Sequence, residues 1–104
     1  MGIREQLDMS VIAAFCQRWR IRELSLFGSA VRGELREDSD VDLLVTFEEG
    51  AGWSLLDHTQ MEQELSELLG RRVDLVSRNG IERSRNLVRR QSILESAEPI
   101  YRAA

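Results

Sequence analysis

The chain has 104 residues, enough for one domain over 1–104, and its 42% hydrophobic content supplies one core but not two. Its net charge is −4, whereas proteins that bind nucleic acid are usually basic, so we do not expect nucleic acid as a partner. No segment approaches the ~18 apolar residues that span a bilayer. The N-terminus also lacks the apolar segment of a signal peptide, so we expect no membrane association and a cytoplasmic location.

A single cysteine, Cys16, and a single histidine, His58, limit the chemistry of any metal site. One cysteine cannot form an internal disulfide, and one Cys with one His cannot form a zinc cluster. Any metal must therefore be held by oxygen ligands, which favours Mg²⁺ or Mn²⁺. We expect Cys16 to be buried and inert, and His58 to be a partly buried packing residue rather than a general base.

The first elements in chain order are a helix and a short strand. Residues 4–19 predict the helix, because apolar side chains recur on one face at Val11, Ile12, Phe15 and Trp19. A polar break at 20–23 follows, and residues 24–27 predict the strand. A helical turn over 29–33 is expected next.

The segment DVDLLVTF, residues 40–47, predicts a second strand because its side chains alternate between two faces. The core face carries Val41, Leu43, Val45 and Phe47. The other face carries Asp40, Asp42, Leu44 and Thr46. Only residues 28–39 connect the first two strands, which is near the lower limit for a parallel crossover, so antiparallel pairing is also open.

Ser54 and Asp57 form a capping-box pattern, which predicts a helix that continues to Leu69 and stops at Gly70. Its apolar positions are Leu55, Met61, Leu65, Leu68 and Leu69. Trp53 immediately precedes the helix and predicts a hydrophobic staple, with base stacking as the alternative.

The last third predicts a strand at 72–77, a turn at Asn79-Gly80 and a weaker helix over 84–95. Pro99 ends that helix, and residues 100–101 pack back onto the body. The element order is therefore α-β-α-β-α-β-α, with the second and third strands as parallel neighbours. This order predicts an α/β (α+β-like) fold in which helices cover a small mixed sheet of at least three strands.

Charge is distributed unevenly along the chain. Residues 34–67 hold eleven acidic residues and one arginine, whereas residues 71–93 hold seven arginines and two acidic residues. A basic C-terminal third could hold phosphates or an acidic partner, with a solvated charged face as the alternative.

Three aspartates interrupt otherwise apolar strands. Asp40 and Asp42 are two positions apart on one strand, so both side chains leave the same face, with Cα atoms ~6.6 Å apart. Asp74 lies between Val73 and Leu75 in the neighbouring strand. Carboxylates this close repel one another, and a divalent cation removes that cost. Three carboxylates on adjacent strands can hold two metal ions ~3.5–4 Å apart, an arrangement for in-line phosphoryl or nucleotidyl transfer.

Gly28-Ser29 follows the first strand and favours a phosphate. A strand that ends at glycine and starts a helix at serine presents free backbone N–H groups, and glycine lets a ligand approach the backbone. Arg32 is near enough to contact phosphate, with a local salt bridge as the alternative. The sequence combines Gly-Ser, a spacer of ten residues, Asp-x-Asp and then a lone aspartate within a further strand. This combination is far more specific than either motif alone.

The segments FGSAVRG and SDVDLLV resemble the signature of the DNA polymerase β-like nucleotidyltransferase superfamily, most closely its minimal nucleotidyltransferases. LLGRRVDLVS is similar to the family's third-carboxylate strand, and ILESAEPIY to its C-terminal end. The resemblance implies a nucleotidyltransferase fold. It also implies that Asp40, Asp42 and Asp74 are catalytic metal ligands and that Gly28, Ser29 and Arg32 bind the nucleotide. Members often have arginine directly after Gly-Ser, and here Ala30 stands in that place.

The resemblance implies a transfer of AMP from ATP to a hydroxyl, with two Mg²⁺ ions as cofactors and Mn²⁺ as a substitute. For a stand-alone member, it implies an antitoxin that assembles with a helical HEPN-domain toxin and adds AMP to a tyrosine of that partner. The alternative is a binding module that neutralises the partner by contact, with chemistry weak or lost.

Overall fold

The computed structural model describes residues 7–28, 31 and 40–103. Four strands form one sheet in the order β3-β2-β1-β4: β1 (Ile21–Phe27), β2 (Val41–Phe47), β3 (Val73–Ser77) and β4 (Glu98–Arg102). β2 and β3 are parallel, whereas β1 is antiparallel to both β2 and β4. The predicted mixed sheet and its parallel second and third strands are confirmed. The direction in which the first two strands pair, which the sequence left undecided, is antiparallel.

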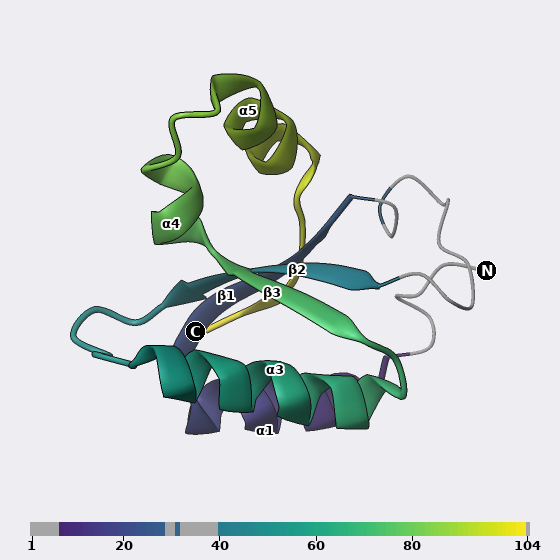
Figure 1. Cartoon of the computed structure of the whole chain (residues 1–104). Helices are drawn as coiled ribbons and strands as arrows, with labels where there is room; N and C mark the ends of the chain where they lie inside the picture. The colour runs from purple at the N-terminus through teal and green to yellow at the C-terminus, as the bar shows by residue number, and fades with distance from the viewer. Residues whose placement is uncertain (1–6, 29–30, 32–39, 104) are drawn as a thin grey trace.

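Helices cover both faces of this sheet (Figure 1). α1 (Met9–Arg18) and α3 (Leu55–Leu69) lie on one face, and α4 (Arg78–Glu82) and α5 (Leu87–Ser96) lie on the other. The main core lies between the sheet and α1 and α3, and it includes Ile12, Phe15, Leu24, Leu26, Val41, Leu43, Val45, Met61, Leu65, Val73 and Leu75. A smaller cluster on the opposite face comprises Phe27, Leu44, Ile81 and Ile93. The predicted core face of the second strand is confirmed.

The first helix is shorter than predicted. Leu7 and Asp8 are not helical, and the Asp8 side chain accepts hydrogen bonds from the N–H groups of Ser10 and Val11 as the N-cap of α1. Residues 4–6 of the predicted helix lie outside the described part. Val11 was wrongly predicted on the buried face, because it is 37% exposed.

The predicted polar break at 20–23 was wrong, because β1 begins at Ile21. Arg20 has a positive φ of 55°, which turns the chain from α1 into β1. Ile21 is buried, and Glu23 pairs with Thr46 on one side and Arg102 on the other. Polar residues here belong to a central strand because partners on both sides satisfy its backbone.

The predicted start and end of α3 are confirmed. Ser54 and Asp57 form a reciprocal capping box, and Gly70 adopts the left-handed conformation at the C-terminus. Within the helix, Met61 and Leu65 are fully buried, whereas Leu55 is 82% exposed and Leu68 is 47% exposed. The predicted apolar stripe was therefore wrong at Leu55 and Leu68, which face away from the sheet.

The capping box provides a stability test that is independent of function. Ser54→Ala should lower the free energy of unfolding by about 1 kcal/mol, because the N–H of Asp57 loses its side-chain acceptor. Urea denaturation measures this change. Leu56→Ala on the same helix is the control, since Leu56 is 83% exposed and has little buried area to lose. Equal losses in the two variants would contradict the capping role.

The C-terminal third contains two elements that were not predicted. Asn79-Gly80 is not a turn but lies in α4, where the Ser77 hydroxyl accepts a hydrogen bond from the N–H of Gly80. The predicted helix over 84–95 is α5, which begins after its N-cap Asn86. Residues 98–102 do not merely pack back but form β4, which pairs with β1 and adds a fourth strand.

The helical turn predicted over 29–33 lies largely outside the described residues.

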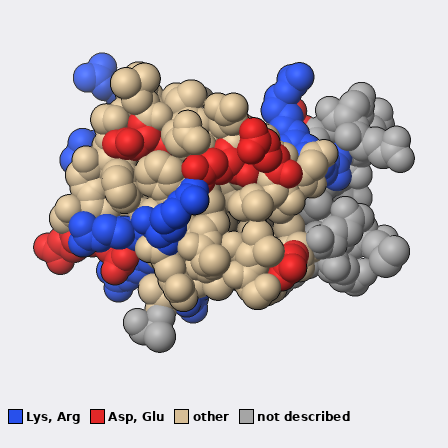
Figure 2. Space-filling model, turned by 90° about the horizontal axis from the view of Figure 1, so that it is seen from below, with Lys and Arg blue, Asp and Glu red and all other residues tan. Residues whose placement is uncertain are grey.

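The lower face of the molecule is formed by α1 and α3. The C-terminal end of α1 is joined to the interior of α3 by an ion pair between Arg18 and Glu64 and by a hydrogen bond from Trp19 Nε1 to Glu64 Oε2 at 2.8 Å. Acidic and basic side chains are interspersed on this face (Figure 2).

In the described part of the chain, no helix is both long and apolar enough to cross a bilayer.

Candidate functional site

The sheet register brings two of the three predicted carboxylates to one place. Asp42 in β2 pairs with Asp74 in β3, and on its other side it pairs with Phe27 in β1. Residues opposite each other in neighbouring strands project to the same face. Asp42 and Asp74 therefore share the face that α4 and α5 cover, just beyond the cluster of Phe27 and Leu44. Asp42 is half-buried and Asp74 is exposed.

Gly28 lies directly against the carboxylate of Asp42. Its φ is +68°, and a Cβ at this position would lie 2.6 Å from Asp42 Oδ2. That distance is too short for any side chain, so the absence of Cβ allows the carboxylate to approach the backbone. The end of β1 and the start of β2 are therefore in close contact at Gly28 and Asp42.

Gly28, Asp42 and Asp74 line one pocket of about 460 Å³. This volume is within the range of small-molecule sites. One wall is the sheet, with Phe27, Gly28, Asp42 and Asp74. The other wall is α5 and its N-cap, with Asn86, Val88, Arg89, Ser92, Ile93 and Ser96. An acidic surface therefore faces a largely polar helix side.

Asp40 and the remaining predicted site residues are placed differently. The Asp40 side chain is 45% exposed, its Oδ1 lies 3.9 Å from Nε of Arg72, and it is not among the described residues that line the pocket. Ser29 and Arg32 lie outside the described residues. Among the described residues, no group of three or more His, Cys, Asp or Glu side chains could hold a metal ion. A ligand role for Asp40 stays a prediction.

The residues that are present fit a divalent cation bound together with a nucleotide. Asp42 and Asp74 offer carboxylate oxygens from directly paired strand positions in one pocket. Mg²⁺ is commonly held by one or two carboxylates, with substrate phosphates and water completing its coordination. Two carboxylates open to a pocket therefore match a cation that arrives with its substrate.

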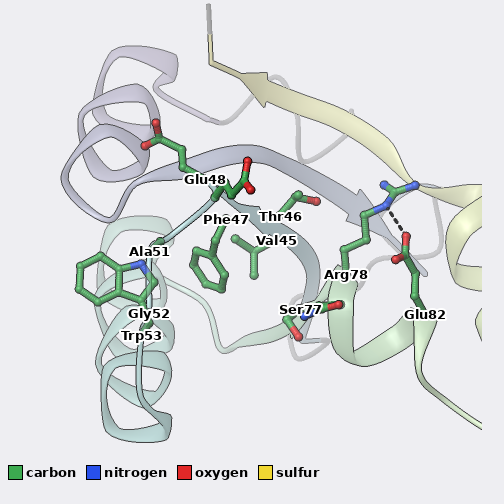
Figure 3. A pocket seen from close by; sticks show the side chains of 12 residues that line it. Val45, Thr46, Phe47, Glu48, Ala51, Gly52, Trp53, Ser77, Arg78 and Glu82 are labelled. Atoms are coloured by element: carbon green, nitrogen blue, oxygen red, sulfur yellow. Dashed lines mark hydrogen bonds and ion pairs between the residues drawn. The ribbon is translucent and has the colours of Figure 1, made fainter.

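A second pocket of about 460 Å³ lies at the far end of β2, beside the loop before α3 and the start of α4 (Figure 3). Arg78 in it pairs with Glu82 at 3.2 Å and with Glu23 at 3.9 Å. The Trp53 ring stands edge-on to Trp19, with its Nε1 donating to the Trp19 carbonyl at 2.7 Å. Trp53 thus links the loop before α3 to the end of α1, which is a structural role, and the predicted staple contact itself stays a prediction.

His58 and Cys16 both lie outside the candidate site. His58 Nε2 lies 2.6 Å from the Leu75 carbonyl oxygen, so the ring links α3 to β3 as a packing residue would. Cys16 is fully buried, as predicted, and burial raises the pKa of its thiol to about 12. The thiol is therefore neutral at physiological pH and is not a nucleophile.

The α5 residues of the pocket were missed by sequence reasoning. Arg89, Ser92 and Ser96 recur at intervals of three and four, which places them on one side of a helix. That spacing was the available signal. It did not show which element the helix would face, because α5 reaches the sheet through packing between residues distant in sequence.

Comparison with known proteins identifies the family. The family model described as a nucleotidyltransferase domain matches residues 9–100. A solved structure described as that of a candidate minimal nucleotidyltransferase is 40% identical, covers 96% of this chain and 97% of its own, and has a TM-score of 0.73. The chain therefore belongs to the nucleotidyltransferase domain family, among its minimal members, and the predicted resemblance and fold class are confirmed.

Two further proteins are similar to this chain over part or most of its length. A protein adenylyltransferase MntA of Thermococcus cleftensis is 52% identical over 65 residues, which cover 62% of this chain and 64% of that protein. The chain thus matches just under two thirds of that relative's length. A re-refined complex of a tri-AMPylated Shewanella oneidensis HEPN toxin with an MNT antitoxin is 21% identical, with a TM-score of 0.63 over 94% of this chain and 72% of that one. At this identity, the second similarity shows the fold alone.

Proposed function

We propose that this protein transfers AMP from ATP to a tyrosine hydroxyl of a HEPN-domain toxin and so acts as its antitoxin. The observation that carries the proposal is the pairing of Asp42 with Asp74 in a pocket that Gly28 also lines. The description of the Thermococcus cleftensis relative as a protein adenylyltransferase supports the reaction. The AMPylated HEPN toxin in the structural neighbour supports the acceptor.

Each predicted site residue has a role in this proposal. Asp42 and Asp74 would hold the divalent cation, and Asp40, which directly precedes β2, would complete the ligand set. The chemistry that bound Mg²⁺ would supply is activation of the attacking oxygen and neutralisation of charge on the leaving pyrophosphate. Gly28 lets the phosphates approach the backbone, and Ser29 and Arg32 contact them. The pocket between the sheet and α5 then holds the nucleotide beside the carboxylates.

The second candidate function is neutralisation of the toxin by contact alone. It is favoured by the position of Asp40, whose carboxylate lies beside Arg72 and outside the described lining of the pocket. A site with two carboxylates in place of three could bind nucleotide with little transfer. Activity measurements on the intact protein separate the two functions.

Label transfer from ATP tests the proposed reaction. The protein is incubated with ATP labelled on the α-phosphate, Mg²⁺ and a HEPN-domain toxin as the candidate partner. We expect label on a tyrosine of that partner, and we expect EDTA to abolish the labelling, because both carboxylates need a cation to bind the phosphates.

The double variant Asp40→Asn/Asp42→Asn is the matched control for that assay. It should reduce labelling at least about 10²-fold, the range seen when a pre-organised electrostatic group is removed from a site. Inhibition of the partner that needs no label transfer and survives in the double variant would contradict catalysis. That result would establish neutralisation by contact.

A further inference from the structure

Arg89 is the one basic residue among the described residues that line the pocket of Asp42 and Asp74. It projects from α5, the wall opposite the carboxylates. The charges of the described lining are therefore two acidic groups on the sheet and one guanidinium on the helix. A ligand that carries negative charge meets repulsion from the first wall and attraction from the second.

The guanidinium of Arg89 has no hydrogen-bond or ion-pair partner within the described part of the chain, whereas several other arginines are engaged. Arg18, Arg72, Arg78 and Arg102 form ion pairs with carboxylates, and Arg90 donates to the Glu82 carbonyl. Arg89 is exposed. Binding an anion at Arg89 would therefore not require an existing ion pair with a described residue to break.

The backbone holds Arg89 in this position. Its N–H donates to Oδ1 of Asn86, the N-cap of α5, at 3.1 Å. Ile93, one helical turn further on and 6% exposed, anchors α5 in the cluster with Phe27 and Leu44. Residues four apart share a helix face, so Arg89 lies on the side that Ile93 turns toward the sheet. The guanidinium thus extends from a supported helix and not from a loop.

We propose that Arg89 binds the phosphates of the nucleotide, an inference that rests on the proposed function. A guanidinium presents a planar fork of donors that matches two phosphate oxygens, and it stays charged at every physiological pH. It supplies positive charge on the helix wall of the pocket, opposite the two carboxylates. The basic C-terminal third of the sequence thus contributes one phosphate ligand, while its other arginines are not assigned this role.

The test compares Arg89→Ala with Arg85→Ala, both changes at exposed arginines, of which only Arg89 lines the pocket. Binding of ATP with Mg²⁺ is measured by calorimetry, and KM for ATP by label transfer. Arg89→Ala should weaken ATP binding and raise KM about 10- to 100-fold, and Arg89→Lys should recover part of the loss. Arg85→Ala should change both less than about twofold. Adenosine, which has no phosphates, should bind the wild-type protein and Arg89→Ala equally.

The outcomes separate this inference from the proposed function. If the wild-type protein transfers AMP and Arg89→Ala matches it in ATP binding and KM, the inference is overturned and the proposed function stands. An effect of Arg89→Ala on KM for the protein acceptor alone would also overturn it. If the wild-type protein binds ATP without transferring AMP, the proposed function fails and the binding measurements still decide the role of Arg89. A wild-type protein that binds no ATP contradicts both.

Discussion

Replacing Asp42 with asparagine should lower the rate of nucleotidyl transfer by about 10²–10³-fold while the protein stays folded. Asparagine has nearly the same shape as aspartate but lacks the charge that binds a cation. Asp42 is the central member of the site, since it pairs with Asp74 on one side and contacts Gly28 on the other. Label transfer from ATP measures the rate.

The same variant should also change the response of stability to Mg²⁺. Like charges directly opposite each other in a sheet destabilise it, so Asp42→Asn should raise the metal-free stability by roughly 0.2–1 kcal/mol. Mg²⁺ at about ten times its dissociation constant should stabilise the wild-type protein by about 1.4 kcal/mol and the variant much less. Thermal unfolding with and without Mg²⁺ measures both effects.

Asp8→Asn is the matched control for Asp42→Asn. Asp8 is the N-cap of α1 on the opposite face of the sheet, and asparagine caps helices about as well as aspartate. The control should retain full transfer and the full response to Mg²⁺. Equal stabilisation by Mg²⁺ in wild type and Asp42→Asn would contradict a cation site at Asp42.

Gly28→Ala should both destabilise the protein and impair transfer. Its positive φ of 68° costs alanine about 1–2 kcal/mol. The new Cβ would also lie 2.6 Å from Asp42 Oδ2, so the carboxylate must move, which adds about 1–3 kcal/mol. A displacement of the carboxylate by about 1 Å should reduce transfer about 10²-fold.

Gly70→Ala separates the two contributions. Gly70 has a similar φ of +64°, but an added Cβ would meet nothing within 4 Å. It should therefore lose only the conformational part of the stability and retain full transfer. Urea denaturation and label transfer are measured on both variants. Equal destabilisation with unchanged transfer in Gly28→Ala would show that Gly28 does not position Asp42.

Much of the fold could be predicted from local patterns. Alternation over 40–47 identified β2 and its core face, and Ser54, Asp57 and Gly70 marked both ends of α3. These signals are reliable because capping hydrogen bonds and strand alternation depend on residues that are close in sequence. The family signature worked for the same reason, since it combines short segments in a fixed order.

The predictions failed where a distant partner decides the structure. Ile21 belongs to β1 because β2 and β4 pair with that strand on both sides. The polar residues that follow Ile21 do not predict a strand by their local pattern. Residues 98–102 form a strand only because β1 is available to pair with them. The Asn79-Gly80 prediction failed for a local reason: the pair is typical of a turn, but the nearby Ser77 hydroxyl caps a short helix there instead.

In the candidate site, too, some features follow from the sequence and others only from the tertiary structure. The sequence by itself determined that aspartates interrupt two strands and that a glycine ends the strand before them, since these facts need only residue identity and strand period. Tertiary structure alone decided that Asp42 and Asp74 are direct neighbours, that Gly28 contacts Asp42, and that Arg89 faces them across a pocket. Strand register and helix packing are set by contacts between residues distant in the chain, and no local pattern encodes those contacts.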